Sequence, residues 1–301
     1  MNAKTIIKSM RLRTLPLSLA GIVLGVCLAA ANYHVGVWTI VFLVLTTICL
    51  QVLSNLSNEL GDTLHGVDTE ERQGIHYSIQ DGEMTVEQMK MLIGVMVVLC
   101  CAFGLAMLKA SFGKIFELTP ILFILLGAAA IGAAMRYTLG SNPYGYRGLG
   151  DVFVFLFFGM ATVCGGFLIC AHEIPSWIYV LPACSIGCFS VGVLNVNNIR
   201  DMKTDAATRR TVALRLGAKR ARIYQTVLIV LGWASMVAFC LLRIFSPWHY
   251  LFVLTLPLFI LHLKGVWTKE DKSLDPMLPM LVMSSFAFAL LAGIGFLVFL
   301  F

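Results

Sequence analysis

The sequence has 301 residues, of which 59% are hydrophobic and only 13% are charged. Soluble domains carry about 25% charged residues, so this composition excludes an ordinary soluble domain and predicts an integral membrane protein. The formal net charge is +6, and we expect membrane lipid rather than nucleic acid around the chain. The basic start, MNAKTIIKSMRLRT, leads into a long apolar run without a small-residue cleavage site, so we expect no cleaved signal peptide.

Nine apolar runs follow one another along the chain, and each is long enough for a membrane span, which takes about 20 residues. They lie at residues 15–33, 38–54, 89–108, 117–135, 152–170, 178–196, 223–242, 248–264 and 278–300. Pro182 and Pro257 fall inside the sixth and eighth runs and predict kinks there. We therefore expect an all-helical integral membrane protein with nine transmembrane helices.

The charged residues are unevenly divided between the two sides of such a bundle. Of the 22 lysines and arginines, only Lys109, Lys114 and Arg243 fall on the side opposite the N-terminus. Positive charge marks the cytoplasmic side of a membrane, so we expect a cytoplasmic N-terminus. Of the 16 acids, only Glu117 and Glu173 fall on the outer side. Acids contribute little to orientation, so their concentration on the inner side predicts chemistry there.

Two sets of polar side chains stand where the second and sixth predicted spans end. Each set has an Asn, an Asp four residues later and then a further Asp: Asn58, Asp62 and Asp68 in the first, and Asn197, Asp201 and Asp205 in the second. Residues four apart share one helix face, so each set directs its oxygens to one side. The sets form a weak internal repeat, which predicts a single domain of two pseudo-repeated halves, about 1–145 and 146–301.

Several aspartates on one rim repel one another unless cations lie between them. Carboxylate and amide oxygens suit Mg²⁺, which is typically bound by one or two carboxylates together with phosphate oxygens. Arg72 follows the first set, and Lys203 and Arg209 accompany the second, so a Mg²⁺-bridged diphosphate fits better than a free ion. A solvated acidic loop is the alternative for either set alone. For most charges of RRTVALRLGAKRAR, anchoring on anionic lipid is the favoured interpretation.

Three tyrosines lie between the fourth and fifth predicted spans, in RYTLGSNPYGYRGLGD. Tyr137, Tyr144 and Tyr146 offer ring faces to an aromatic substrate or an allylic cation, although tyrosines are also common at membrane interfaces. Asp151, which opens the fifth span, is either a helix N-cap or part of the site. His65 is expected to be an inert loop residue.

These stretches resemble the UbiA superfamily of intramembrane prenyltransferases, and within it the 1,4-dihydroxy-2-naphthoate polyprenyltransferases of menaquinone synthesis. The resemblance extends nearly from end to end, through RLRTLPLSLAGIVLG, QVLSNLSNELGDTLHGVDTEERQG, PYGYRGLGDVFVFLFFG, NVNNIRDMKTDAATRRTVALRLG and LDPMLP. The two aspartate motifs are typical of the superfamily, whereas PYGYRGLGD and the late Asp68 are typical of the naphthoate branch. The resemblance implies a UbiA-type bundle around a central cavity that the two acidic motifs cap.

The resemblance also implies the roles of individual residues. The metal and diphosphate set would be Asn58, Asp62, Asp68, Asn197, Asp201 and Asp205, with Mg²⁺ as the cofactor. Its four aspartates, together with Tyr137 near the family's cavity tyrosine, are the expected catalytic residues. Arg13 and Arg72 fall where the family has basic residues near the phosphates, and Lys203 and Arg209 are expected to help bind the diphosphate.

One position departs from the family pattern. Where the family usually has Asn followed by Asp, this chain has Asn58 followed by Glu59. Glutamate is one methylene longer than aspartate, so whether Glu59 binds metal is left open at this point.

The activity that the resemblance implies is transfer of a polyprenyl group from its diphosphate to 1,4-dihydroxy-2-naphthoate. Carbon dioxide and diphosphate would be lost, giving demethylmenaquinone. A different aromatic acceptor, such as 4-hydroxybenzoate, is the alternative among enzymes. An ion-coupled transporter is the alternative from another class, although transporter sites lie near the midplane and these acids lie at helix ends. We expect a multi-pass protein of the inner (cytoplasmic) membrane whose site opens to the cytoplasm.

Overall fold

The computed structural model of the protein describes residues 2–67, 77–173, 176–243 and 245–298. This described part is helical and contains no strand. Nine of its helical segments are long and apolar enough to cross a membrane, which confirms the predicted number. They are Ala3–Ala30, Val37–Leu64, Val86–Phe112, Leu118–Arg136, Gly150–Ala171, Trp177–Arg200, Ala218–Leu241, Pro247–Thr268 and Asp271–Val298. The chain is therefore a multi-pass membrane protein.

The helices follow the chain in a simple order. The first four spans comprise α1 (Ala3–Met10), η1 (Leu12–Thr14), α2 (Leu15–Ala30), α3 (Val37–Leu64), α4 (Val86–Phe112) and α5 (Leu118–Arg136). The short turn η2 (Tyr144–Arg147) leads to the fifth span, made of α6 (Gly150–Val154), η3 (Phe155–Gly165) and α7 (Gly166–Ala171). The remaining elements are η4 (Trp177–Tyr179), α8 (Val180–Arg200), α9 (Met202–Asp205), α10 (Val212–Leu216), α11 (Ala218–Leu241), η5 (Pro247–Thr255), α12 (Leu256–Thr268), η6 (Asp271–Leu274) and α13 (Met277–Val298).

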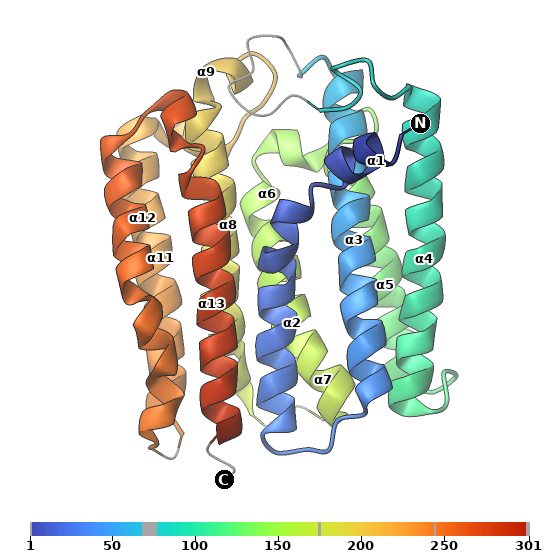
Figure 1. The fold of residues 1–301 in the computed structure, drawn as a ribbon, viewed down its shortest axis with the longest axis vertical. Coiled ribbons are helices and arrows are strands. Elements are labelled where there is room, and N and C mark those ends of the chain that lie inside the picture. Colours follow the sequence, from blue (N-terminus) through green and yellow to red (C-terminus); the bar gives the residue numbers. More distant parts are fainter. Residues whose placement is uncertain (1, 68–76, 174–175, 244, 299–301) are drawn as a thin grey trace.

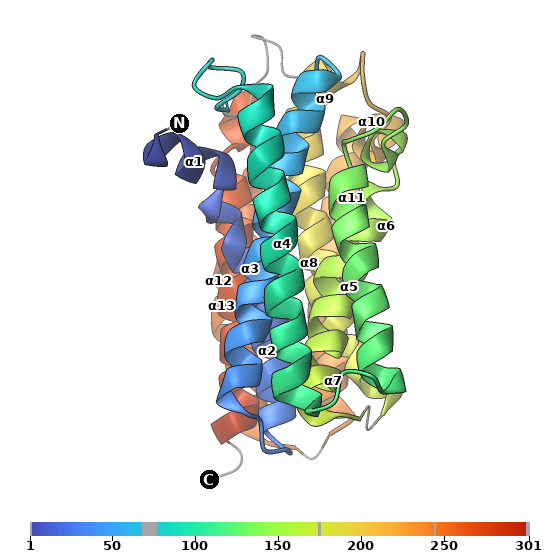
Figure 2. The ribbon, with the colours of Figure 1, turned by 90° about the vertical axis from the view of Figure 1, so that its right-hand side faces the viewer.

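The spans form an upright bundle (Figure 1). Helices α3, α4 and α5 lie at one flank and α11 and α12 at the other, with α2, α8, α13 and the fifth span between them. Seen from the side, α1 lies across one end of the bundle rather than along it (Figure 2). The N-terminus is at the end where α9 lies and the C-terminus is at the other, as an odd number of spans requires.

The two largest apolar clusters of the described residues hold most of the bundle together. The larger one joins α2, α8, α11, α12 and α13, and its centre is a group of fully buried rings, Phe189, Phe259 and Phe288, whose centroids are 4.7 to 6.0 Å apart. The smaller one packs α3 on α4 through Leu53 and Met89. Because lipid tails are as apolar as these side chains, close packing rather than exclusion of water holds the spans together.

The fifth span is wedged between α2 and α8 because glycines allow the backbones to approach. A Cβ atom on Gly25 of α2 would lie 2.5 Å from the carbonyl oxygen of Val163, and one on Gly159 would lie 2.6 Å from that of Ala183 in α8. Half of this span, η3, is a π-helix. Such segments frequently occur at functional sites, and nothing in the hydrophobic pattern predicted this one.

The two prolines predicted to cause kinks have different surroundings. Pro182 lies in the first turn of the uninterrupted helix α8, where its missing N–H costs no hydrogen bond. Pro257 stands at the start of α12, where the 3₁₀ helix η5 changes into an α-helix. The irregular part of the eighth span therefore precedes its proline.

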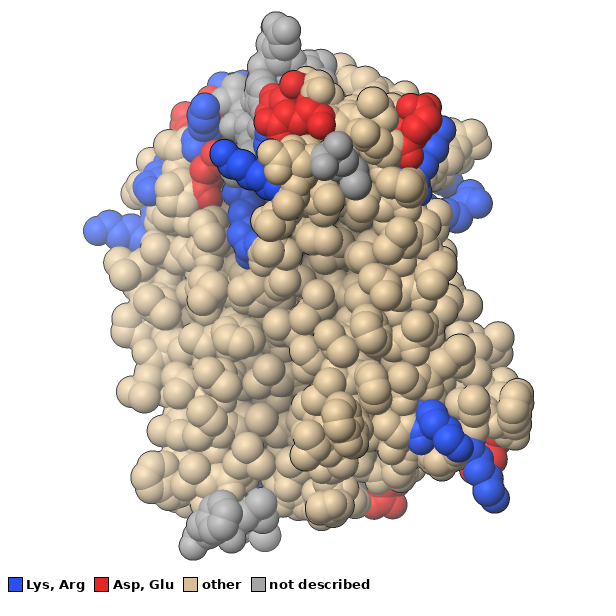
Figure 3. Space-filling view, turned by 45° about the vertical axis from the view of Figure 1, so that its right-hand side comes forward, with Lys and Arg blue, Asp and Glu red and all other residues tan. Residues whose placement is uncertain are grey.

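Charged side chains gather at the end of the bundle where α1 and α9 lie, and the surface below them is a broad uncharged belt (Figure 3). A second, smaller charged group occupies the opposite end of the face shown. We call the first of these the acidic end, because it contains Asp62, Asp201 and Asp205. The cytoplasmic N-terminus and the division into two halves near residue 145, which falls in η2, stay predictions.

Candidate active site

The first acidic set lies on the last turns of α3. Asn58 and Asp62 are one helical turn apart, and Asp62 is buried, with 3% of its surface exposed. Its Oδ1 accepts hydrogen bonds from the Tyr146 hydroxyl at 2.7 Å and from Nη2 of Arg209 at 2.5 Å. Burial and the neighbouring Asp62 raise the pKa of the Tyr146 phenol, so this hydroxyl remains a donor. A buried carboxylate needs such donors, because an unpaired buried charge is very costly.

The second acidic set lies where α8 ends and α9 begins. Backbone hydrogen bonds from Asp201 N to Asn197 O, at 3.1 Å, and from Asp205 N to Asp201 O, at 2.8 Å, carry the helical spacing across this junction. Asp201 and Asp205 are only 2% and 4% exposed. The described members of both sets therefore lie at the same end of the bundle, as predicted, and their aspartates Asp62, Asp201 and Asp205 are buried.

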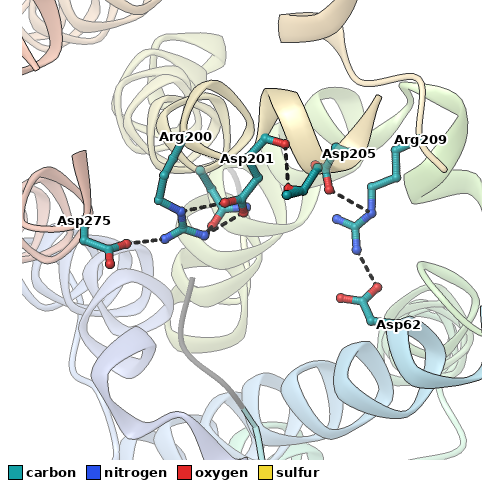
Figure 4. Close-up of polar contacts among 8 residues, drawn as sticks. Asp62, Arg200, Asp201, Asp205, Arg209 and Asp275 are labelled. Atoms are coloured by element: carbon teal, nitrogen blue, oxygen red, sulfur yellow. Dashed lines mark hydrogen bonds and ion pairs between the residues drawn. The ribbon is translucent and has the colours of Figure 1, made fainter. Parts of the chain in front are cut away.

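Arg209 joins the two sets (Figure 4). In addition to its bond with Asp62, its Nε lies 3.8 Å from Oδ1 of Asp205, and its guanidinium carbon lies 4.8 Å from the centre of the Tyr146 ring. Burial by itself would lower the pKa of Arg209, but Asp62 and Asp205 outweigh this and raise it above its ordinary value. Arg209 is thus a permanent cation between carboxylates from two distant parts of the chain.

A second arginine, Arg200, bonds to the second set and was not among the predicted residues. It is the last residue of α8, it is 4% exposed, and it contacts both carboxylate oxygens of Asp201. It also donates hydrogen bonds to Asn197 at 2.9 Å and to Asp275 at 2.6 Å, the latter visible in Figure 4. The available signal was its place in NVNNIRD, directly before a motif aspartate, where an arginine at the end of an apolar helix needs an acidic partner.

An apolar cavity of about 340 Å³ begins beside Asn58 and extends along α3 as far as Leu43. These residues are 15 positions apart, so the cavity follows the helix for about 22 Å at a rise of 1.5 Å per residue. A few polar side chains of α2 and α3 lie on its wall: Ser18, Gln51, Ser54 and Asn55. The cavity is long and narrow enough for an extended apolar chain and lies next to the first acidic set.

Aromatic side chains line the acidic end of this cavity. The rings of Tyr144 and Phe153 stack with centroids 4.1 Å apart, and Tyr137 meets Tyr144 edge to face at 5.4 Å. Burial raises the pKa of Tyr137 to about 12, and its charged neighbours include Arg209 and Asp62. The Tyr137 hydroxyl is therefore neutral and lies between the acidic sets and the apolar cavity.

One wall of the cavity is thin. Phe123, Leu126, Gly127 and Ala130 of α5 line it, yet Pro120 is the single buried residue that this helix has. The outer side of α5 is therefore open to lipid along its length. Only one helix separates much of the cavity from the membrane.

Glu59 is bonded to neighbours other than the acidic sets. It is fully buried, and its Oε1 accepts hydrogen bonds from the backbone N of Ile79 at 3.1 Å and from the Ser9 hydroxyl at 3.4 Å. These bonds fasten α1 and the segment before α4 to α3. Glu59, the residue that departs from the family pattern, therefore connects three segments of the fold.

Two other polar residues of the predicted loops also have structural partners. The ring nitrogens of His65 lie 2.8 and 3.0 Å from the carbonyl oxygens of Gly61 and Gly140, which ties the end of α3 to the loop after α5. Helix α6 has no side-chain N-cap, and Oδ2 of Asp151 accepts a hydrogen bond from the Tyr224 hydroxyl at 3.0 Å. The interpretation of Asp151 as a helix cap is therefore wrong.

Comparison with known proteins decides the family. Residues 18–286 match the model of the UbiA prenyltransferase family. The chain belongs to this family. It is 38% identical to 1,4-dihydroxy-2-naphthoate octaprenyltransferase of Haemophilus influenzae over 292 residues, which cover 96% of this chain and 94% of that protein. It is 36% identical to the protein of the same name from Escherichia coli, with the same coverage.

Solved structures of UbiA homologues share the fold. The apo structure of the homologue from Aeropyrum pernix K1 superposes with a TM-score of 0.68 at 15% identity and covers 98% of this chain and 99% of that one. The homologue from Archaeoglobus fulgidus bound to DMAPP and Mg²⁺ gives a TM-score of 0.63 at 15% identity with the same coverage. The predicted fold, a UbiA-type helical bundle, is confirmed.

The remaining residues that the UbiA resemblance implied have varied positions. Asp68 and Arg72 lie outside the described residues. Arg13 is exposed in η1 at the acidic end. The Lys203 side chain is 73% exposed and its Nζ lies 2.5 Å from Oδ2 of Asp271, so Lys203 lies on the rim of the site. The roles of these four residues stay predictions.

The donor set of this UbiA prenyltransferase suits Mg²⁺ by its chemistry. Among the described residues, no three His, Cys, Asp or Glu side chains converge closely enough to form a metal site by themselves. In phosphate-binding sites, however, Mg²⁺ is typically held by one or two carboxylates and by substrate phosphates. The carboxylate and amide oxygens of Asn58, Asp62, Asn197, Asp201 and Asp205 fit that pattern, and binding of Mg²⁺ by these residues stays a prediction.

Proposed function

We propose that this protein transfers a polyprenyl group from a polyprenyl diphosphate to 1,4-dihydroxy-2-naphthoate, giving the reduced, hydroquinone form of demethylmenaquinone together with carbon dioxide and diphosphate. The observation that carries the proposal is the position of the two acidic sets, whose described aspartates are buried and which Arg209 joins, next to a long apolar cavity whose near end is aromatic. The names of the relatives from Haemophilus influenzae and Escherichia coli support the naphthoate acceptor.

The acidic end would bind the diphosphate. Mg²⁺ held by Asn58, Asp62, Asp68, Asn197, Asp201 and Asp205 would supply positive charge that stabilises the leaving diphosphate. Arginine donors aimed at the phosphate oxygens add to this stabilisation, which is strongest where water is excluded. Arg209, between the two sets in Figure 4, would donate to the diphosphate oxygens. We assign three other basic residues to the diphosphate: Arg13, Arg72 and Lys203.

The cavity would shield the allylic cation that forms when the carbon–oxygen bond to diphosphate breaks. Its apolar walls keep water from this cation, and the ring faces of Tyr137 and Tyr144 attract positive charge. The electron-rich naphthoate ring then forms a bond from the carbon that bears its carboxylate to the allylic carbon. Loss of carbon dioxide returns the electron pair to the ring and restores aromaticity, so the reaction needs no strong base.

We further propose that the acidic end faces the cytoplasm at the inner membrane and that the isoprenoid tail reaches lipid past α5. The distribution of lysine and arginine supports this orientation. The position of the acids at helix ends rather than near the midplane favours an enzyme over an ion-coupled transporter.

The test is a competition experiment with purified protein in lipid nanodiscs. The protein receives polyprenyl diphosphate, Mg²⁺ and equal amounts of 1,4-dihydroxy-2-naphthoate and 4-hydroxybenzoate, and mass spectrometry identifies the product. We expect the decarboxylated prenyl naphthalene, and we expect its loss in Asp62→Ala but not in Glu87→Gln, which changes an acid in the first turn of α4. A prenylated hydroxybenzoate, or the absence of any prenylated product, would overturn the proposal.

A further inference from the structure

Arg200 donates four hydrogen bonds to side chains of the acidic end. Its Nε and Nη2 donate to the two oxygens of Asp201, at 2.8 and 2.6 Å. Its Nη2 also donates to Oδ1 of Asn197 at 2.9 Å, and its Nη1 donates to Oδ1 of Asp275 at 2.6 Å. All three guanidinium nitrogens are thus bonded, and every partner is an oxygen of a carboxylate or an amide.

The contact with Asp201 is bidentate, and this geometry has a specific consequence. Two parallel N–H···O bonds fix both the position and the plane of a carboxylate. Each carboxylate oxygen has two lone pairs, so an oxygen that accepts from Arg200 retains a second lone pair for another partner. Because Nη2 is shared with Asn197, one rigid guanidinium also sets the distance between the amide oxygen and the carboxylate.

Asp275 holds Arg200 from the other side. It lies between η6 and α13, at the start of the ninth span, and its side chain is 34% exposed. The segment from η6 to α13 is distant from Arg200 in the sequence, since Asp275 is 75 positions further on. Asp275 therefore prevents the guanidinium from turning away from Asp201 and connects the second acidic set to the last span.

Arg209 and Arg200 differ in what they connect. Arg209 bridges Asp62 and Asp205, which belong to different sets. Arg200 instead bonds two members of one set, Asn197 and Asp201, and an aspartate that belongs to neither. Arg209 is thus placed between the sets, whereas Arg200 supports one of them from behind.

We propose that Arg200 is a positioning residue for the metal and diphosphate site: it orients Asp201 and Asn197, and Asp275 is its anchor. This inference rests on the proposed function. Groups that orient metal ligands typically change metal affinity by about 10- to 100-fold when they are removed. Lysine in place of Arg200 would keep the charge but lose the planar fork, so it separates orientation from neutralisation.

The experiment measures binding of Mn²⁺, as a spectroscopic substitute for Mg²⁺, to the purified full-length protein by electron paramagnetic resonance, both without and with inorganic diphosphate. For Arg200→Lys we expect the dissociation constant of Mn²⁺ to rise about 10- to 100-fold, and for Asp275→Asn about tenfold. In steady-state assays of both variants, the Mg²⁺ concentration that gives half the maximal rate should rise in parallel with the dissociation constant of Mn²⁺. The KM for the naphthoate should not change.

The matched control is Arg222→Lys. Arg222 also ties a span to the segment before η6, since its Nη2 donates to Lys269 O at 2.9 Å and lies 3.6 Å from Glu270, but it contacts no described member of the acidic sets. We expect wild-type Mn²⁺ affinity for this variant. If Arg200→Lys does not fold, Asp275→Asn carries the test, because Asp275 is partly exposed and asparagine keeps its size but removes the negative charge that strengthens its bond to Arg200.

The outcomes separate the two proposals. Equal Mn²⁺ affinity in the wild type, in Asp275→Asn and in folded Arg200→Lys would overturn the positioning role alone. A wild type that binds no Mn²⁺ even with inorganic diphosphate present would overturn the metal-dependent function and, with it, this inference.

Discussion

A methyl group at Gly61 should disturb the site strongly, because α3 and the end of α5 touch there. A Cβ atom on Gly61 would lie 2.5 Å from both Cβ and Oγ1 of Thr138 and 2.7 Å from its carbonyl carbon. Carbon atoms in contact are normally about 3.5 to 4.0 Å apart, so Gly61→Ala requires a separation of roughly 1 Å. Overpacking of this kind costs about 1–3 kcal/mol.

The effect on activity should be larger than the effect on stability. Thr138 donates a hydrogen bond to Ser57 O at 2.9 Å and is followed by the loop that carries Tyr146, so its displacement also moves Asn58 and the partners of Asp62. A misplacement of about 1 Å can reduce a rate about 100-fold. We therefore expect Gly61→Ala to lower the melting temperature modestly and the rate of prenyl transfer by about two orders of magnitude.

The assay combines a thermal melt in detergent with the prenyl transfer rate in nanodiscs, and its control is Gly94→Ala. Gly94 lies in the interior of α4, where an added methyl group would meet none of the described atoms outside its own helix within 4 Å. Alanine there should stabilise the helix by about 1 kcal/mol and leave the rate unchanged. Wild-type rate and melting temperature in Gly61→Ala would refute the argument from close approach.

Three further predictions address single side chains. Arg209→Gln leaves Asp62 and Asp205 without their shared cation, and removing one partner of a buried ion pair costs about 3–5 kcal/mol. Thermal melts should therefore show marked destabilisation, and prenyl transfer should fall below detection. A stable, active variant would contradict the bridging role. Burial disfavours the ionised Tyr137 phenol, so its pKa is about 12 in the folded protein against 10.0 ordinarily. The free energy of unfolding is therefore unaffected by this group below pH 10 and decreases as the pH rises from 10 to 12. In pH-dependent melts Tyr137→Phe should lose less stability than the wild type between pH 10 and 12, and identical curves would rule this out. Glu59→Gln should lower the melting temperature but leave Mn²⁺ affinity at the wild-type value, whereas weakened Mn²⁺ binding would identify Glu59 as a ligand.

The spans and the acidic sets could be predicted because their signals are local. A membrane span requires about 20 consecutive apolar residues, and an Asn or Asp repeated every four residues at the end of such a run marks one helix face. The pairs Asn58 with Asp62 and Asn197 with Asp201 have this spacing in the sequence itself. That both sets lie at the same end follows from the even number of spans between them.

The partners of these acids could not be predicted from local signals. Arg209 and Asp62 are 147 positions apart, and Arg200 and Asp275 are 75 apart. The order of residues does not say which of several arginines meets which aspartate when the spans pack. Asp151 shows the same limit, because its position suggested a helix cap while packing placed Tyr224 against it.

The direction of a side chain at the end of a helix was also beyond the sequence pattern. Glu59 stands beside Asn58, so proximity alone made it a candidate ligand, yet adjacent helix residues point about 100° apart. The structure places it against Ser9 and Ile79. Tyr146 is the converse case: it was one of three loop tyrosines, and its bond to Asp62 distinguishes it only after folding.

The thin wall formed by α5 determines how the isoprenoid tail of the substrate would reach the surrounding lipid. One face of α5 lines the cavity and the other is exposed along the bundle. The isoprenoid tail of substrate and product would therefore remain in the apolar cavity or in the hydrocarbon core of the bilayer throughout a turnover. The bilayer then acts as both reservoir and recipient. Turnover should consequently depend on the fluidity and thickness of the surrounding lipid, much as the rate of a soluble enzyme depends on the viscosity of its solvent.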